Sequence, residues 1–309
     1  MSVKNIILMP VYEDIESAAL LMKGIAKKVG RETFIVAVDD GSVQFPTDAS
    51  IIRDAGLEGV VVNLKRNLGH QRAIAVGISY IAKYYPDANC LIMDSDGEDT
   101  PASAQSMLNL LPDCEEEIIV ATRKSRVESF QFKLFYFFYR HLFAILAGRK
   151  ISFGNFMALK PQAVQRLSVM QELWVHVAGS VLVSRLRVHN VPFDRGARYR
   201  GKSKMNFNSL VLHGFKAVMV FAEDVLVRVG VLCMIIGAFA MLAILLTSVL
   251  KWIGLATPGW FSIAIAVLFI VLLQTAALTL ISLMLTGIMR GSNVVVDDFE
   301  QMVRSVTEA

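Results

Sequence analysis

The chain has 309 residues, a formal net charge of +4 and a hydrophobic fraction of 54%. Its mean hydropathy of +0.51 is too high for an ordinary soluble enzyme, so part of the chain is expected to contact a membrane. The modest charge and the lack of a nucleic-acid-binding motif argue against DNA or RNA as a partner. Cys90, Cys114 and Cys233 lack C-x-x-C spacing and are expected to be small core residues in a reducing compartment.

Apolar runs alternate with helically spaced segments through residues 1–205. Strands are predicted at residues 5–9, 33–38, 59–64, 90–93 and 117–122. Helices are predicted between them at residues 17–29, 49–55, 71–84 and 102–111. This alternation predicts an α/β domain with a parallel, doubly wound sheet.

Polar loops follow the first three predicted strands. The first carries Tyr12, which is suited to stacking on a base, and the second carries Asp39 and Asp40, which are suited to accepting hydrogen bonds from a base or a ribose. The third carries Arg66 and Arg72 ahead of a helix N-terminus, a favourable place for a diphosphate. Ligands of open α/β sheets bind at this edge, so the recurrence of such loops indicates one binding site.

Asp94 and Asp96 follow the fourth predicted strand, one residue apart. Two carboxylates at that edge favour a divalent cation, and a cation there commonly accompanies a phosphate. His70 is expected to be a hydrogen-bonded structural residue rather than a catalyst. The G-x-G-x-x-G and G-x-x-x-x-G-K-[ST] motifs are missing, which argues against a dehydrogenase and a P-loop NTPase.

These segments resemble those of family 2 glycosyltransferases, which have the GT-A fold, a nucleotide-sugar-binding, Rossmann-like sheet. The matching segments are Pro10-Val11-Tyr12, Val38 to Ser42, Arg66 to Gly69 and Met93 to Asp96. Arg198 to Lys204 resembles the R-x-x-G-x-S-K segment of one branch. That branch includes dolichol-phosphate mannose synthases and bacterial polyprenyl-phosphate glycosyltransferases, whose bacterial members often end in two membrane helices.

The resemblance implies a role for each matched residue. Asp94 and Asp96 would be the catalytic pair and would hold Mg²⁺ or Mn²⁺, with Asp96 the direct ligand. The nucleotide would contact Pro10, Tyr12, Asp14, Asp39, Asp40 and Arg66. The diphosphate would contact Arg198, Ser203 and Lys204. Candidates for the acceptor phosphate are Arg123 and Arg126, together with Lys133 and Arg140, all of which could equally be surface cations.

The chain departs from the family pattern at three places. Asp14, rather than Glu13, matches the acid of the first loop, and Glu98 stands where the family usually has glutamine. The later acidic segment of the family is replaced here by a run that holds Ser152 and Asn155. A catalytic carboxylate at that segment is therefore not expected.

Two uncharged apolar runs, residues 229–250 and 261–287, exceed the roughly 20 residues that span a bilayer. The predicted domains are a catalytic domain at 1–205, an interfacial amphipathic helix region at 206–228, a transmembrane hairpin at 229–289 and a C-terminal tail at 290–309. A second interfacial helix is predicted at residues 130–146. Basic residues flank the hairpin on its domain side, which puts the domain and both termini in the cytoplasm, at the inner membrane. No signal peptide is expected.

The expected activity is inverting transfer of a sugar from a UDP- or GDP-sugar to undecaprenyl or dolichyl phosphate at the cytoplasmic membrane face. A phosphomonoester has a second pKa of about 6, so at neutral pH the acceptor is already largely a dianionic nucleophile and needs no strong general base. One alternative is a membrane glycosyltransferase that uses a lipid or glycan hydroxyl. Another is a catalytically silent scaffold that binds a sugar nucleotide. The sequence leaves open the sugar, the choice of nucleotide, the lipid length and a homo-oligomer.

Overall fold

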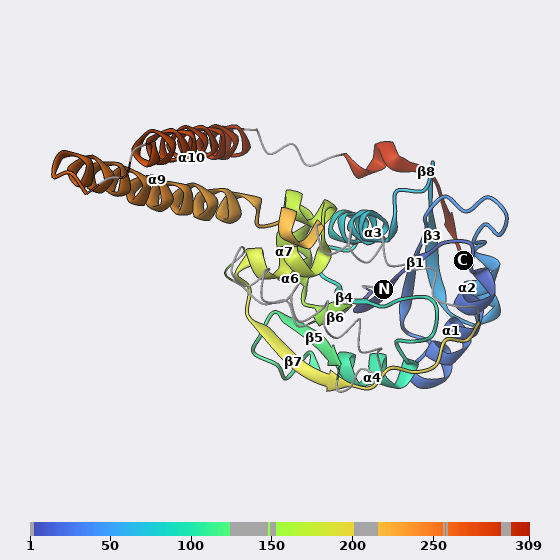
Figure 1. The fold of residues 1–309 in the computed structure, drawn as a ribbon. Helices are drawn as coiled ribbons and strands as arrows, with labels where there is room; N and C mark the ends of the chain where they lie inside the picture. Colours follow the sequence, from blue (N-terminus) through green and yellow to red (C-terminus); the bar gives the residue numbers. More distant parts are fainter. Residues whose placement is uncertain are drawn as a thin grey trace. The chain divides into compact units, whose positions relative to one another are not determined.

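The computed structural model describes residues 3–123, 148, 153–200, 216–255, 257, 259–291 and 298–309. The chain divides into two compact units. The first comprises Met1–Leu134, Ile151–Val220 and Val295–Ala309, and the second comprises Phe135–Lys150 and Phe221–Val294. The first unit holds the sheet and the second holds two long helices (Figure 1).

An eight-stranded sheet forms the first unit, in the order β7-β5-β6-β4-β1-β2-β3-β8. The strands are β1 (Asn5–Val11), β2 (Phe34–Asp39), β3 (Glu58–Leu64), β4 (Asn89–Ile92), β5 (Ile118–Arg123), β6 (Phe153–Leu159), β7 (Val188–Phe193) and β8 (Val303–Glu308). Strands β4, β1, β2 and β3 are parallel neighbours. The predicted α/β fold with a mostly parallel sheet is confirmed, and all five predicted strands are present.

Helices cover both faces of the sheet (Figure 1). They are α1 (Ile15–Lys28), α2 (Ser50–Asp54), α3 (His70–Tyr84), α4 (Pro101–Leu110), α6 (Pro161–Ser168), α7 (Val177–Ser184) and the 3₁₀ helix η1 (Gln171–Trp174). Ile6 and Leu8 of β1 pack in one core with α3, α6, η1 and α7. Ile7 and Met9 pack in a second core with α1, α2 and α4. Because successive strand residues face opposite ways, a strand buried on both faces must be apolar throughout, as β1 is.

The sheet is not wholly parallel, which corrects the simple doubly wound arrangement predicted from alternation. Strand β6 runs antiparallel to both β4 and β5, and β8 runs antiparallel to β3. Strands β6, β7 and β8 were not predicted from the sequence. The edge strands β7 and β8 carry many exposed polar residues, and Gly154 and Asn155 follow the first residue of β6, so none has the continuous apolar run of a central strand.

The C-terminal segment predicted as a tail instead returns to the sheet. Strand β8 pairs with β3, and η2 (Phe299–Met302) precedes it. The Glu300 carboxylate accepts hydrogen bonds from Lys83 Nζ at 2.7 Å and Tyr84 Oη at 2.8 Å, and these bonds lower the pKa of Glu300. Phe299 meets the ring of Tyr80 edge-on at 6.4 Å. The segment thereby covers the edge of β3, which would otherwise be open to pairing with another chain.

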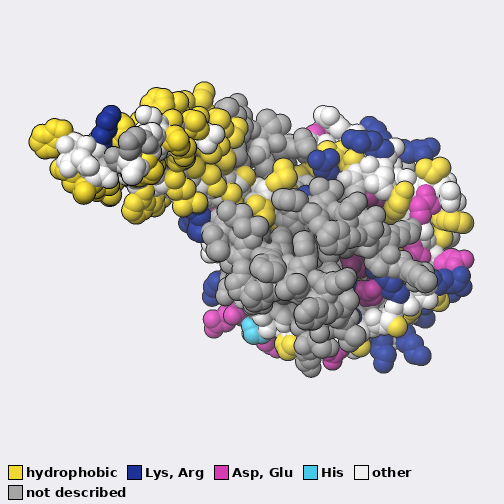
Figure 2. Space-filling model, viewed as in Figure 1, with side chains coloured by type: hydrophobic (Ala, Val, Ile, Leu, Met, Phe, Trp, Pro, Cys, Tyr) yellow, Lys and Arg dark blue, Asp and Glu magenta, His cyan; other side chains and the backbone are white. Residues whose placement is uncertain are grey.

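Helices α9 (Ala222–Trp252) and α10 (Trp260–Gly291) form the hairpin, and both are long and apolar enough to cross a membrane. A Cβ on Gly230 would lie 3.7 Å from Ser282, and one on Gly237 would lie 3.4 Å from Thr275 Oγ1. The later residue of α9 contacts the earlier residue of α10, so the two helices are antiparallel. Small residues at the contact allow close packing of helices in lipid. The apolar side chains on the outer surface of the hairpin are exposed (Figure 2).

Part of the predicted interfacial region at 206–228 lies in this helical segment. Residues 216–219 are helical, and α9 begins at Ala222, seven residues before the predicted membrane span. The interfacial helix predicted at residues 130–146 lies outside the described residues.

Helix α3 approaches the sheet most closely at Gly77. A Cβ there would lie 2.2 Å from Cδ1 of Leu8, which is fully buried. We expect Gly77→Val to lower the free energy of unfolding by about 1–3 kcal/mol, because overpacking forces the core apart. Urea unfolding of the detergent-solubilised protein, followed by circular dichroism, measures this change. Gly154→Val is the control, since no atom lies within 4 Å of its Cβ position, and equal loss in both variants would contradict the argument.

Candidate functional site

The candidate site lies at the sheet edge where β4, β1, β2 and β3 end. The register pairs Val11 of β1 with Asp39 of β2, and Asp39 with Asn63 of β3. The loops that follow these strands therefore begin side by side. They comprise residues 12–14, 40–49, 65–69 and 93–100.

Glu13 holds the first two loops together. Its carboxylate accepts hydrogen bonds from the backbone N–H groups of Val43 at 2.6 Å, Gln44 at 3.1 Å and Phe45 at 2.8 Å. Its backbone has a positive φ of 49°. Asp14 caps helix α1 and accepts from Ser17 N at 3.3 Å. The role of Glu13 in joining the loops was not predicted from the sequence, because its partners lie about 30 residues away along the chain.

Asp39 and Asp40 are buried and organise the next two loops. Asp39 accepts from the N–H groups of Ser42 at 2.7 Å and Thr47 at 2.6 Å. Asp40 accepts from Leu68 at 2.7 Å and Gly69 at 2.9 Å. Burial raises the pKa of Asp40, and the two N–H donors oppose that rise. Each carboxylate oxygen keeps a further lone pair that can accept a hydrogen bond from a ligand. The contact of Asp39 and Asp40 with a base or a ribose stays a prediction.

Gly41 lets the second and third loops approach each other. Its φ is +72°, and a Cβ there would lie 2.4 Å from the carbonyl carbon of Arg66. The side chain of Arg66 is exposed, and Tyr12 is 44% exposed at the end of β1. Pro10 is buried within β1 opposite Val38, so it supports the loop rather than offering a surface to a ligand.

Asp94, in the fourth loop, lies beside the residue that follows the third loop. His70 Nε2, at the start of α3, lies 3.3 Å from Asp94 Oδ1 and 3.0 Å from Asn155 Nδ2 on β6. The Asp94 N–H donates to Asp99 Oδ2 at 3.1 Å, which fixes the turn of the loop. Asn155 is therefore linked to Asp94 through His70. His70 and Asn155 are not paired in the sequence, because only the antiparallel course of β6 brings them together.

A segment after β7, residues 194–200, lies across the acidic loop. Arg198 Nη2 lies 2.9 Å from Asp96 Oδ2, and Arg195 Nη2 lies 4.0 Å from Asp94 Oδ2. Both arginines also pair with Glu98. The negative charge that Glu98 adds to the loop is thus matched by the two guanidinium groups, and Arg195 was not identified from the sequence.

Backbone contacts fix the same segment. Gly196 N donates to Glu98 O at 2.9 Å, and Tyr199 N donates to Asp96 O at 3.0 Å. The ring of Tyr199 lies against Gly97, where a Cβ would be 2.5 Å from Cδ2 of the ring. Gly97 has a φ of +86°, so both its conformation and this ring require glycine.

The remaining predicted residues cannot be placed at the site. Arg123 is the last residue of β5, but its side chain lies outside the described part of the chain, as do Arg126, Ser203 and Lys204 entirely. Ser152 lies outside it too.

The acidic pair suits a hard divalent cation. Asp94 and Asp96 offer carboxylate oxygens, the donors that Mg²⁺ and Mn²⁺ prefer. Burial raises the pKa of Asp96, the charge of Asp94 raises it further, and Arg198 opposes both. The two carboxylates are therefore close enough to repel each other, and a cation between them would relieve that repulsion.

No family model matches the chain. An uncharacterised glycosyltransferase of Synechocystis sp. is 27% identical over 288 residues, which cover 87% of this chain and 86% of the relative. Two Bacillus subtilis proteins also match. The uncharacterised glycosyltransferase YkoT is 25% identical over 82% of this chain and 76% of its own length. The putative glycosyltransferase CsbB is 23% identical over 89% and 84%. These relatives confirm the prediction of a glycosyltransferase enzyme.

Two solved structures resemble the fold, with lower sequence identity than these relatives. Glucosyl-3-phosphoglycerate synthase of Mycobacterium tuberculosis, in complex with Mn²⁺, UDP-glucose and phosphoglyceric acid, has a TM-score of 0.48 and 16% identity, covering 73% of this chain and 79% of that one. TarS of S. aureus has a TM-score of 0.40 and 16% identity, covering 75% and 65%. Similarity at this level is too low to transfer a ligand or a substrate.

The two hydrogen bonds to Asp40 are expected to hold the third loop in place. In Asp40→Asn, one oxygen becomes an NH₂ group, which leaves a loop N–H without an acceptor. We expect a loss of about 1–3 kcal/mol in the free energy of unfolding, measured by urea unfolding. Asp48→Asn is the control, because Asp48 lies in an exposed position of the second loop and its oxygen accepts from Ser50 N at 2.7 Å, a role that asparagine also fills. A similar loss in both variants would contradict this role for Asp40.

Proposed function

We propose that this glycosyltransferase moves a sugar from a UDP- or GDP-sugar to a polyprenyl phosphate, with inversion at the anomeric carbon. The observation that carries the proposal is the arrangement of the acidic pair. Asp94 and Asp96 lie at the edge where four strand-end loops meet, and two arginines reach them from residues 194–200.

The nucleotide would lie along the first three loops. Tyr12 is exposed at the end of β1, where its ring can stack on a base, and the loops organised by Asp39 and Asp40 lie beside it. Asp14 and Arg66 stay candidates on the same edge, and Pro10 would act by shaping the loop. Mg²⁺ or Mn²⁺ bound by Asp94 and Asp96 would supply Lewis-acid stabilisation of the departing diphosphate.

Arg195 and Arg198 would change partners when the donor binds. In the structure they neutralise the acidic loop. A diphosphate is a stronger anion that accepts the same bidentate hydrogen bonds, so it would draw these guanidinium groups toward the leaving group. Ser203 and Lys204 would extend this contact, and Arg123 and Arg126 are candidates for the acceptor phosphate.

The acceptor is proposed to be a phosphate because the site lacks a carboxylate at position 155. Asn155 contacts His70, and an amide cannot remove a proton from a hydroxyl, so this position supplies no carboxylate base. A phosphomonoester has a second pKa of about 6 and is already largely dianionic at neutral pH. The residues then have to bring two anions together, which the basic segment and the cation favour.

The helical hairpin supports a lipid acceptor. Helices α9 and α10 present apolar surfaces long enough for a bilayer, and the chain before and after them belongs to the unit that carries the site. Anchoring an enzyme in the membrane of its acceptor raises the effective concentration of that acceptor. We propose that the hairpin spans the inner membrane, with the sheet domain and both termini in the cytoplasm.

Asp96→Asn tests the acidic pair. We expect transfer of labelled sugar to polyprenyl phosphate to fall at least ~100-fold, because groups that stabilise a leaving anion typically contribute 10²–10³ each. EDTA should stop transfer by the wild-type protein, and added Mg²⁺ or Mn²⁺ should restore it. The control is Asp87→Asn, an exposed acid in the loop before β4, at the opposite edge of the sheet. Full activity in Asp96→Asn or in EDTA would rule out the proposed role of the metal.

The nature of the acceptor is tested with lipids matched in their chains. Purified protein is given labelled UDP- and GDP-sugars with either undecaprenyl phosphate or undecaprenol, and the labelled lipid is extracted and counted. We expect product only with the phosphate. Product with the alcohol would favour a hydroxyl acceptor, and nucleotide binding without turnover on either lipid would favour a silent scaffold.

A further inference from the structure

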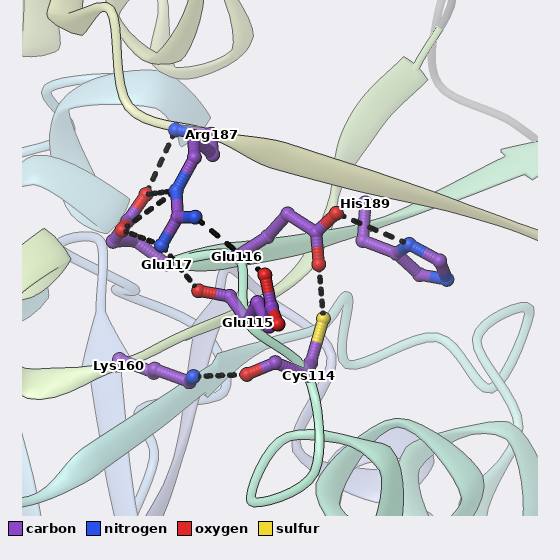
Figure 3. A network of polar contacts seen from close by, with 7 residues as sticks. All are labelled: Cys114, Glu115, Glu116, Glu117, Lys160, Arg187 and His189. Atoms are coloured by element: carbon purple, nitrogen blue, oxygen red, sulfur yellow. Dashed lines mark hydrogen bonds and ion pairs between the residues drawn. The ribbon is translucent and has the colours of Figure 1, made fainter.

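A second cluster of polar side chains lies at the opposite edge of the sheet. Strand β6 runs antiparallel to β4, so its end at Leu159 lies away from the acidic pair and beside Ile118, where β5 begins. Val188, at the start of β7, also pairs with Ile118. The loop before β5, residues 114–117, therefore meets the first residues of β7 at this edge (Figure 3).

Three consecutive glutamates in this loop face two directions. Glu117 pairs with Arg187, whose Nη2 lies 2.8 Å from Glu117 Oε1, and the same nitrogen donates to the carbonyl oxygen of Glu115 at 2.6 Å. Arg187 Nη1 lies 4.0 Å from the Glu115 carboxylate. Glu116 points to the other side of the chain, as alternate residues of an extended segment do (Figure 3). One arginine thus engages the two outer glutamates and leaves the middle one to other partners.

Those partners are a thiol and an imidazole. Cys114 Sγ donates to Glu116 Oε2 at 2.9 Å, and His189 Nδ1 lies 3.8 Å from Glu116 Oε1. One donor atom from each of the three side chains lies within 4.8 Å of the others. Cys90 and Cys233 are buried, and Cys114 is partly exposed where it packs against the second core.

Sulfur, nitrogen and carboxylate oxygen at this spacing match the chemistry of zinc. Zn²⁺ binds cysteine at about 2.3 Å and histidine and carboxylate at about 2.0–2.2 Å, and it adopts tetrahedral coordination. Donor atoms separated as these are can reach one ion with small side-chain rotations. The acidic pair at the other edge offers only oxygen donors and favours harder cations, so the two sites differ in chemical class.

We propose that Cys114, Glu116 and His189 form a Zn²⁺ site, with water as the fourth ligand. The ion takes the place of the thiol proton, which leaves to solvent. The Lys160 ammonium donates to the carbonyl oxygen of Cys114 and holds the loop that presents the sulfur. The site joins the loop before β5 to the edge strand β7. A bound ion would cross-link this loop to β7, which leads directly into residues 194–200, where Arg195 and Arg198 lie.

Cobalt provides a test that does not depend on enzymatic activity. The purified, reduced full-length protein is titrated with Co²⁺ in the presence of excess Mg²⁺, and the thiolate-to-cobalt charge-transfer absorption is recorded in the near ultraviolet. We expect this band in the wild type, its loss in Cys114→Ser, and its bleaching when Zn²⁺ is added. Asp96→Asn should keep the band, because the acidic pair contains no sulfur.

Matched variants identify the other two ligands. Glu116→Gln and His189→Gln should each weaken Zn²⁺ affinity at least ~10-fold. Removing only a hydrogen-bond partner of a metal ligand already costs about 10-fold, and these variants remove a ligand itself. Glu115→Gln is the control, since this side chain lies in the same loop and faces Arg187. Zn²⁺ should also raise the melting temperature of the wild type and not that of Cys114→Ser. Absence of the band in the wild type, its persistence in Cys114→Ser, or equal affinities in Glu116→Gln and Glu115→Gln would overturn the proposal.

Discussion

Carboxylates that accept hydrogen bonds from loop N–H groups are the constraint on which the site depends. The N–H groups that Asp39 and Asp40 bind are buried or partly buried, where an unpaired N–H is costly, while those that Glu13 binds are exposed. Glu13, Asp39 and Asp40 supply the acceptors, and each reaches at least two N–H groups. The acids therefore shape the loops as well as offering lone pairs to a ligand.

The use of carboxylates as acceptors also gathers negative charge at the edge of the sheet where the site lies. Asp94, Asp96 and Glu98 add to it in the fourth loop, and Arg195 and Arg198 neutralise it from a segment that follows β7. In such an arrangement a metal cation could replace the arginines beside the carboxylates, and a diphosphate could replace the carboxylates beside the arginines.

Strand β8 ties the end of the chain to the unit that carries the site. After α10 the chain returns to β3, where Glu300 engages Lys83 and Tyr84 and Phe299 meets Tyr80. The hairpin is therefore an insertion between two segments of one unit rather than an appendage at its end. An inserted hairpin has two covalent links to the sheet domain, which restricts its motion more than one link would.

The sequence by itself determined the central strands and the two long apolar helices, and it placed Asp94 and Asp96 at the end of a strand. Strands such as β1 are buried on both faces and must be apolar throughout, and a helix able to cross a membrane must be long and apolar, so local composition reveals both. Asp94 and Asp96 were visible because they directly follow such a strand. Only the tertiary structure decided which acids organise the loops, since the partners of Glu13 lie about 30 residues away. It also decided the antiparallel courses of β6 and β8, which bring Asn155 to His70 and Glu300 to Lys83. Pairing between distant edge strands depends on which backbone groups meet across the sheet, and the side-chain pattern along one segment does not record it.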